Sequence, residues 1–245
     1  MGKEGKVKDK KRKIKLAASM LCADQGSLIS QVKEIELAGT DMLHIDIMDG
    51  HFVPNMTGGS DYANEIRSVS SIVCDYHFMV EKPDEQIAML KGLRSSDRIC
   101  FHAECGSDCL KVIDQIHQMG AKAGLAINPG TPVAAIEKFL SETDYILLLI
   151  VNPGFKGQPV ILRTLRKLSE LRNTLDKMGK DAEEILIDGA VTFDNILEIV
   201  RLGADNLVCG PYTCFNKELG GIKPTLNKVK EILGNEGYDV EAGDR

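Results

Sequence analysis

The segment HIDIMDG, residues 44–50, carries polar side chains inside the pattern of a buried strand. Side chains alternate between the two faces of a strand, so His44, Asp46 and Met48 share one face while Ile45 and Ile47 share the other. An imidazole and a carboxylate on one face can bind a divalent metal ion or transfer protons. In a solvated sheet such a face would need no function, so its meaning depends on where this strand lies.

Two further segments carry the same kinds of side chain. DYHFMV, residues 75–80, alternates His77 with Met79, and ILIDGA, residues 185–190, ends an apolar run at Asp188. Each residue alone could be a hydrogen-bonded core histidine or a turn-capping aspartate. Jointly, the two imidazoles and two carboxylates of His44, Asp46, His77 and Asp188 predict a site for one divalent ion per chain, and their mixed nitrogen and oxygen donors leave Zn, Fe, Mn and Co open.

A repeating order of elements predicts how these residues are positioned. Eight short apolar runs alternate with segments that include amphipathic helical patterns, and the runs cover 15–21, 42–48, 72–80, 98–103, 122–128, 145–151, 184–188 and 206–210. Continuous apolar runs such as YILLLIV are typical of parallel strands that are covered on both sides. About eight strand–helix units predict a (β/α)8 TIM barrel of the α/β class. An open doubly wound sheet is the alternative, but no GxGxxG follows the first strand. In a barrel the functional site lies at the C-terminal strand ends, where these side chains would meet.

Length and composition indicate one barrel domain with two tails. The chain has 245 residues, of which 43% are hydrophobic, so we expect the barrel over 15–233, a flexible basic tail over 1–14 and a polar tail over 234–245. The basic tail could instead serve nuclear targeting or bind anions. The net charge of −6 argues against a general nucleic-acid binder, and no apolar run is long enough to span a membrane. Seven cysteines without a CxxC pair indicate reduced thiols and a cytoplasmic protein.

The segment HIDIMDGHFVPN resembles the signature of the ribulose-phosphate 3-epimerase family. The resemblance extends from about Lys15 to Phe215 through SMLCAD, DYHFMV, FHAE, GLAINPGTP, VNPGFKGQ and IDGAV. It implies a metal-dependent isomerase of the pentose phosphate pathway that inverts C3 of a phosphorylated ketose. Asp46 and Asp188 would be its catalytic acid and base, each also binding the metal ion with His44 and His77. The implied partners are the phosphorylated ketose and further copies of the chain in a homo-oligomer, with no nucleic acid and no membrane.

The resemblance also implies a set of substrate-binding residues. Ser19, Met48 and Met79 would contact the sugar, and loops after strands 6, 7 and 8 would bind its phosphate through Gly154, Phe155, Lys156, Gly157, Gly189, Ala190, Gly210 and Pro211. Lys156, Ala190 and Pro211 depart from the usual family pattern. Pro211 has no N–H to donate, and Lys156 could either bind the phosphate or point to solvent. His102 in FHAE could support the pocket, without a role that the sequence assigns.

Three functional hypotheses remain open from the sequence. The first is interconversion of D-ribulose 5-phosphate and D-xylulose 5-phosphate, and the second is the six-carbon reaction of a D-allulose-6-phosphate 3-epimerase, which SMLCAD, GQP and a longer eighth loop favour. The third is a sugar-phosphate-binding barrel without turnover, against which Asp46 and Asp188 argue. Related decarboxylases carry lysine where this chain has Met48, which counts against their chemistry.

Overall fold

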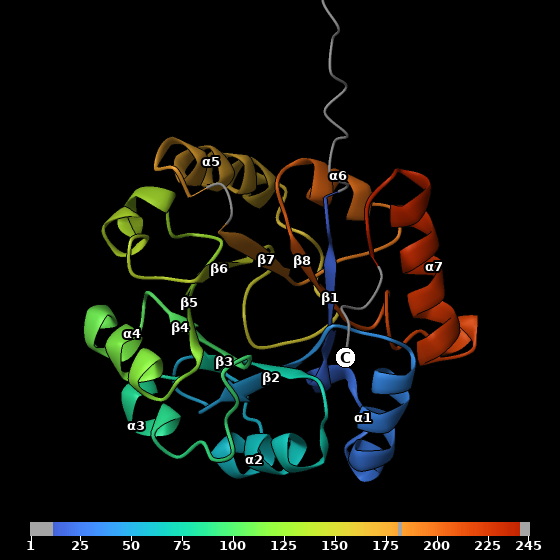
Figure 1. The fold of residues 1–245 in the computed structure, drawn as a ribbon, viewed down its shortest axis with the longest axis horizontal. Coiled ribbons are helices and arrows are strands. Elements are labelled where there is room, and N and C mark those ends of the chain that lie inside the picture. Colours follow the sequence, from blue (N-terminus) through green and yellow to red (C-terminus); the bar gives the residue numbers. More distant parts are fainter. Residues whose placement is uncertain (1–11, 181–182, 241–245) are drawn as a thin grey trace, which may run out of the picture.

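The computed structural model describes residues 12–180 and 183–240, and it contains a closed barrel of eight parallel strands (Figure 1). The strands are β1 (Lys15–Ser19), β2 (Met42–Met48), β3 (Val73–Met79), β4 (Arg98–His102), β5 (Lys122–Ile127), β6 (Tyr145–Leu149), β7 (Glu184–Asp188) and β8 (Asn206–Cys209). Each pairs with the next, and β1 closes the ring against β8 with Lys15 opposite Asn206. The predicted (β/α)8 barrel is therefore confirmed.

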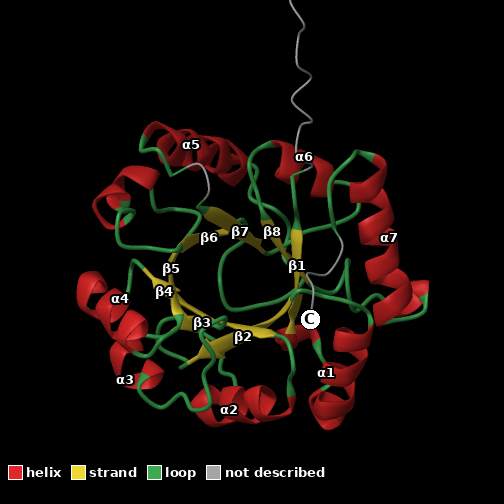
Figure 2. Ribbon diagram, in the orientation of Figure 1, coloured by secondary structure: helices red, strands yellow, loops and turns green. Residues whose placement is uncertain are grey.

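Helices surround the ring of strands (Figure 2). They are α1 (Leu28–Leu37), α2 (Gly59–Val69), α3 (Pro83–Ile87), α4 (Cys109–Gln118), α5 (Arg163–Lys177), α6 (Ile196–Arg201) and α7 (Ile222–Asn235). Short 3-10 turns lie at η1 (Met20–Cys22), η2 (Gln25–Ser27), η3 (Val133–Ala135), η4 (Glu137–Phe139) and η5 (Lys217–Leu219). Between β5 and β6, the segment 132–140 forms the two short 3-10 turns η3 and η4 and no α-helix.

Two layers of apolar side chains hold the barrel. The alternation in β2 sends Ile45 and Ile47 outward into the large core between strands and helices. Met42 faces inward, into a smaller core that Tyr145, Leu147 and the other inward-facing apolar residues fill. The polar residues of β2 share the inward face with Met42, so they look into the barrel and not into bulk water.

The barrel interior below the site contains buried charges. The Arg98 guanidinium lies 3.8 Å from the centre of the Tyr145 ring, pairs with Asp75 at 3.3 Å and donates to Glu184 at 2.5 Å. Tyr145 has room because its register partner is Gly124, where an added Cβ would lie 2.3 Å from the ring. These pairs compensate charges that would be costly to bury alone.

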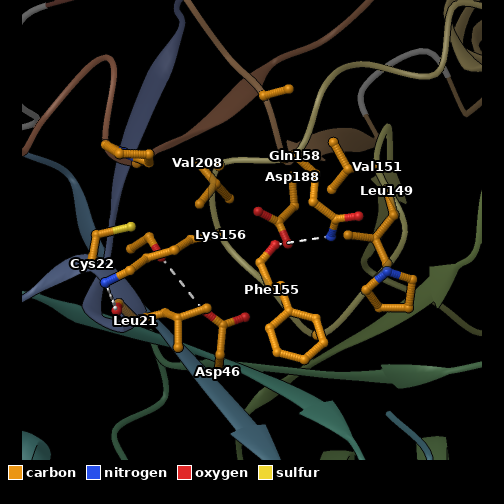
Figure 3. A pocket seen from close by; sticks show the side chains of 18 of the residues that line it. Leu21, Cys22, Asp46, Leu149, Val151, Phe155, Lys156, Gln158, Asp188 and Val208 are labelled. Atoms are coloured by element: carbon orange, nitrogen blue, oxygen red, sulfur yellow. Dashed lines mark hydrogen bonds between the residues drawn. The ribbon is translucent and has the colours of Figure 1, made fainter. Parts of the chain in front are cut away.

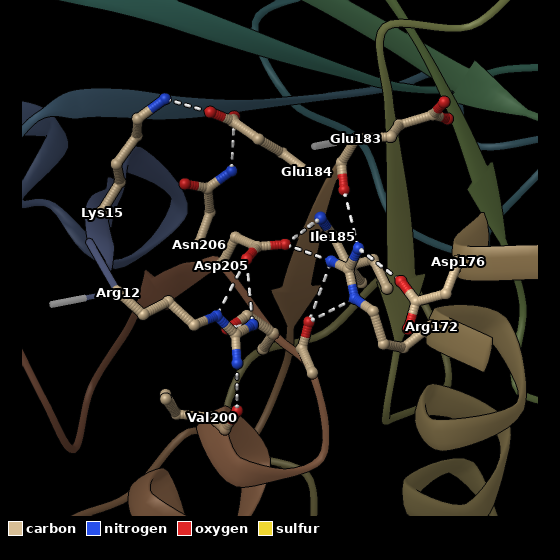
Figure 4. Close-up of polar contacts among 12 residues, drawn as sticks. Arg12, Lys15, Arg172, Asp176, Glu183, Glu184, Ile185, Val200, Asp205 and Asn206 are labelled. Atoms are coloured by element: carbon tan, nitrogen blue, oxygen red, sulfur yellow. Dashed lines mark hydrogen bonds and ion pairs between the residues drawn. The ribbon is translucent and has the colours of Figure 1, made fainter. Parts of the chain in front are cut away.

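The base of the barrel is closed by a polar network that Figure 4 shows. Arg12 and Arg172 both donate to Asp205, and Arg12 also donates to the Val200 and Ala204 carbonyls at 3.0 and 2.7 Å. Nearby, Lys15 pairs with Glu184, which also accepts from the Asn206 amide. The network ties the segment before β1 to β7 and β8.

The described parts of the two predicted tails lie against each other. Ile14 is buried and its N–H donates to the Asp239 carbonyl, while the Asp239 N–H donates to the Arg12 carbonyl. Residues 1–11 and 241–245, which hold most of the predicted N-terminal tail and the end of the predicted C-terminal tail, lie outside the described residues. Among the helices in the described part of the chain, none has the length and apolar character that a membrane crossing requires.

Candidate metal centre and active site

The structure brings the four predicted ligand residues together at the C-terminal ends of three strands. His44 and Asp46 come from β2, His77 from β3 and Asp188 from β7, and one donor atom from each lies within 4.8 Å of the others. His44 Nε2 lies 3.4 Å from Asp46 Oδ1 and 3.9 Å from Asp188 Oδ2. His77 Nδ1 lies 3.2 and 3.7 Å from the same two oxygens. The four form a group that could hold a metal ion.

One buried nitrogen tests whether an ion fits this group. The Nε2 atom of His44 finds no hydrogen-bond partner among the described residues, although the side chain is fully buried. A buried polar atom without a partner costs about 1–3 kcal/mol. A cation between Nε2 and the two carboxylates would use this nitrogen as a ligand, so the residues fit a metal ion.

The other ring nitrogen of His44 is held by a buried carboxylate. Nδ1 lies 2.7 Å from Asp75 Oδ2, and the other oxygen of Asp75 accepts from the Tyr145 hydroxyl at 2.9 Å. Burial alone would raise the pKa of Asp75, but the contacts with His44 and Arg98 lower it. An ionised Asp75 accepts the hydrogen bond from Nδ1–H, so Nε2 is the nitrogen that the neutral ring would offer to a metal ion. The sequence predicts no role for Asp75, although it begins the segment DYHFMV.

The two carboxylates of the site have different environments. Burial would raise the pKa of Asp46, but His44 and His77 hold it well below its usual range. Burial raises the pKa of Asp188, and attraction to His44 offsets this rise only in part. For His44, burial would lower the pKa, but the Asp46 carboxylate raises it well above its ordinary value. These are strong mutual interactions of the kind found at functional sites.

A cavity opens beside these residues, between the loops that follow β1, β6, β7 and β8. The cavity and its mouth enclose about 590 Å³. All eight residues predicted to bind phosphate line it, as do Ser19, Met48 and Met79. Ser19 Oγ donates to Asp46 Oδ2 at 3.5 Å, and the two methionines are buried against Val53. The cavity is also lined by residues for which the sequence predicts no individual role: Leu21, Cys22, Leu149, Val151, Asn152, Pro153, Gln158, Val191, Val208 and Tyr212.

Lys156 lies across the mouth of this cavity, as Figure 3 shows. Its ammonium donates to the Leu21 carbonyl at 3.4 Å, so the side chain connects the loop after β6 with the turn after β1. Gln158 steadies the same loop by donating to the Phe155 carbonyl at 3.0 Å. Lys156 is the one cationic side chain among the described residues that line the cavity.

The loop after β7 has an unusual backbone conformation at the cavity wall. Gly189 has φ +96°, and an added Cβ there would lie 2.3 Å from Val151. The next residue, Ala190, has φ +48°, in the left-handed region that costs a residue with a Cβ about 1–2 kcal/mol. Strain of this kind often accompanies a binding loop, because it turns backbone N–H groups toward a ligand.

His102 supports His77 from the side away from the cavity. Their Nε2 atoms lie 2.9 Å apart, and His102 Nδ1 lies 3.1 Å from Glu104 Oε2. Burial lowers the pKa of His102 to about 4. The sequence offered no role for His102, because this contact depends on two side-chain orientations.

Residues 15–214 match the model of the ribulose-phosphate 3 epimerase family. The chain is 40% identical over 218 residues to a ribulose-phosphate 3-epimerase of Aquifex aeolicus, with 89% of this chain and 96% of the relative covered. It is 40% identical over 198 residues to the enzyme of Bacillus subtilis, covering 80% of this chain and 90% of the relative. A ribulose-5-phosphate-3-epimerase from the chloroplast of Arabidopsis thaliana is 38% identical, with 82% and 71% covered.

Solved structures with similar folds have much lower identity. A thiamine phosphate pyrophosphorylase from Pyrococcus furiosus superposes with a TM-score of 0.59 at 13% identity, covering 90% of this chain and 98% of that one. A phosphoribosyl anthranilate isomerase from Thermus thermophilus gives 0.57 at 12%, with 91% and 100% covered. At such identity the likeness shows the barrel fold alone.

Proposed function

Because the chain belongs to the ribulose-phosphate 3-epimerase family, we propose that it interconverts D-ribulose 5-phosphate and D-xylulose 5-phosphate by inverting C3. The observation that carries this proposal is the group of His44, Asp46, His77 and Asp188 beside a cavity at the C-terminal end of the barrel. The unpartnered Nε2 of His44 supports a role for that group in metal binding.

The four residues would hold one divalent ion, of the Zn, Fe, Mn or Co type. When bound, such an ion supplies Lewis-acid stabilisation of the negative charge that develops on oxygen when a proton leaves the neighbouring carbon. Asp75 keeps the His44 ring in the orientation and tautomer that this role needs. Ser19 donates to Asp46 and so restrains the carboxylate that faces the cavity.

Asp46 and Asp188 would transfer the protons. Inversion through a planar enediolate requires one acid or base on each face, since a single base tends to return the proton to the face it left. The two carboxylates come from β2 and β7 and enter the site from different sides (Figure 3). One would accept the C3 proton while the other donates, with the roles exchanged in the reverse direction.

The phosphate would bind at the opposite end of the cavity. Gly154, Gly157 and Ala190, in the loops after β6 and β7, line this end and would supply backbone N–H groups, and Gly189 lines the same wall. Pro211 contributes no donor, and the Lys156 ammonium would supply a charged one from across the mouth. Met48 and Met79 would cover the apolar face of the sugar.

The test is exchange of the C3 proton with D₂O, measured by NMR on each epimer separately. The metal-loaded protein should exchange and invert D-ribulose 5-phosphate. Asp46→Asn and Asp188→Asn should each abolish inversion, while each retains exchange on one epimer, a different one in the two variants. Asp194→Asn, at an exposed carboxylate in the loop after β7, is the matched control and should exchange normally.

Three outcomes separate the competing hypotheses. Faster turnover of D-allulose 6-phosphate than of D-ribulose 5-phosphate would assign the six-carbon reaction instead. Binding of either sugar phosphate without exchange would indicate a binding protein. Loss of exchange on both epimers in both variants, with metal content retained, would contradict the assignment of one carboxylate to each face.

We also propose that the enzyme works in a reducing compartment such as the cytoplasm. All seven cysteines are free in the structure, and five of them are buried.

Assembly into a homo-oligomer is a further proposal, which light scattering of the purified protein would test.

A further inference from the structure

The ring of His77 contacts a second histidine that lies outside the group of four proposed ligands. His77 presents Nδ1 to Asp46 and Asp188, while its Nε2 lies 2.9 Å from Nε2 of His102. Both rings are fully buried and stack with their centres 5.0 Å apart. Two ring nitrogens at hydrogen-bond distance share one proton, so one of them donates and the other accepts.

The contact between Glu104 and the other ring nitrogen of His102 indicates which of the two Nε2 atoms donates. Its Oε2 lies 3.1 Å from His102 Nδ1, and an ionised carboxylate can only accept. Nδ1 of His102 therefore carries the proton, and the neutral ring accepts at Nε2. His77 must then donate from Nε2, which leaves its Nδ1 bare toward Asp46 and Asp188.

Glu104 is fixed in this orientation by the loop after β5. Its Oε1 accepts from the backbone N–H of Asn128 at 2.9 Å and from the Thr131 hydroxyl. Hydrogen bonds from His102, Thr131 and the Asn128 N–H lower the pKa of Glu104 against the effect of burial, so the carboxylate stays ionised at neutral pH. Every group that faces the two oxygens of Glu104 in these contacts is a donor.

We propose that Glu104 is a positioning residue, which sets the tautomer of His77 through His102 and so prepares Nδ1 of His77 to bind the metal ion. The role of the ion rests on the proposed function. Asp75 contacts His44 directly, whereas Glu104 acts on His77 only through His102. A substitution of Glu104, which does not touch the proposed ligands, should therefore change metal affinity.

The comparison of Glu104→Gln with Glu104→Ala separates this role from loop support. A glutamine at 104 must keep its amide oxygen on the Asn128 N–H, so its NH₂ group faces His102 Nδ1. That nitrogen must then accept, the His102 proton moves to Nε2, and the His77 proton is forced onto Nδ1, the atom that should bind metal. Alanine imposes no tautomer, because it offers neither donor nor acceptor.

The measurements are the dissociation constant for Co²⁺, by competition with a chelator, and the ¹⁵N shifts of the imidazole rings. Glu104→Gln should weaken Co²⁺ binding about 10- to 100-fold, more than Glu104→Ala does. The ¹⁵N spectrum of the wild type should show His102 protonated at Nδ1, and that of Glu104→Gln should show it protonated at Nε2. Glu85→Gln, at an exposed ion pair with Lys82, is the matched control and should change neither quantity.

A wild-type affinity in Glu104→Gln, or an equal or larger loss in Glu104→Ala, would overturn the proposal, since support of the loop alone predicts that ranking. An unchanged His102 tautomer in Glu104→Gln would do so even if Glu104→Ala does not fold. Turnover of D-ribulose 5-phosphate is recorded separately. If the tautomers and Co²⁺ affinities are as expected but no turnover is seen, the proposed function would be contradicted, while the positioning role of Glu104 would still be supported.

Discussion

Glu184 should provide a part of the stability that is lost in acid. The carboxylate accepts from Arg98 at 2.5 Å and from Asn206 at 2.9 Å, and it pairs with Lys15. Burial would raise the pKa of Glu184, but Arg98 and Lys15 lower it from 4.5 to about 2. The side chain is 26% exposed, so screening by solvent is modest.

The sign and size of the effect follow from this pKa. A carboxylate whose pKa is lower in the folded state stabilises the protein fully above its unfolded pKa and progressively less as the pH falls through the folded value. The window for Glu184 therefore extends from about pH 4.5 down to about pH 2. The shift corresponds to about 3 kcal/mol.

The assay is urea unfolding of the metal-free protein at a series of pH values, comparing wild type with Glu184→Gln. The difference in unfolding free energy should be largest near pH 7 and should shrink steadily below about pH 4.5. Glu85→Gln, whose carboxylate is exposed, should stay within about 0.5 kcal/mol of the wild type throughout. The reasoning would be refuted if the difference in unfolding free energy between the wild type and Glu184→Gln did not change with pH.

Two further substitutions probe the cavity and the barrel interior. Lys156→Met should raise KM for the sugar phosphate about 10-fold and leave kcat nearly unchanged, because it removes a charged hydrogen bond made before and during the reaction; steady-state kinetics would contradict this if kcat fell while KM stayed constant. Gly124→Ala should lower the free energy of unfolding by about 1–3 kcal/mol, since its Cβ would lie 2.3 Å from the Tyr145 ring. A urea midpoint equal to that of the wild type would show that the ring moves freely.

The sequence was sufficient to predict the strands and the residues that meet at the site. Their runs are apolar and buried on both sides, so period and length alone placed β2 at Met42–Met48 and β7 at Glu184–Asp188. The convergence of His44, His77 and Asp188 follows from the barrel, because all parallel strands end at the same rim.

The side-chain contacts around the proposed ligands are less predictable from the sequence. Asp75 and His77 are two residues apart in β3 and share its inward face. This period of two could have indicated that Asp75 lies in the barrel interior. The contact between His77 and His102 has no such signal, since it depends on how two rings are turned. The path of Lys156 to the Leu21 carbonyl likewise depends on loop conformation.

The closure of the ring by β1 and β8 also imposes an order in time on the protein. During synthesis the chain delivers His44, Asp46 and His77 early, from two adjacent strands, whereas Asp188 emerges much later on β7. The barrel cannot close until β8 reaches β1, and Arg12 cannot meet Asp205 before then. A nascent chain thus presents three of the proposed ligands without the fourth, and the proposed metal centre can be completed only in the finished molecule.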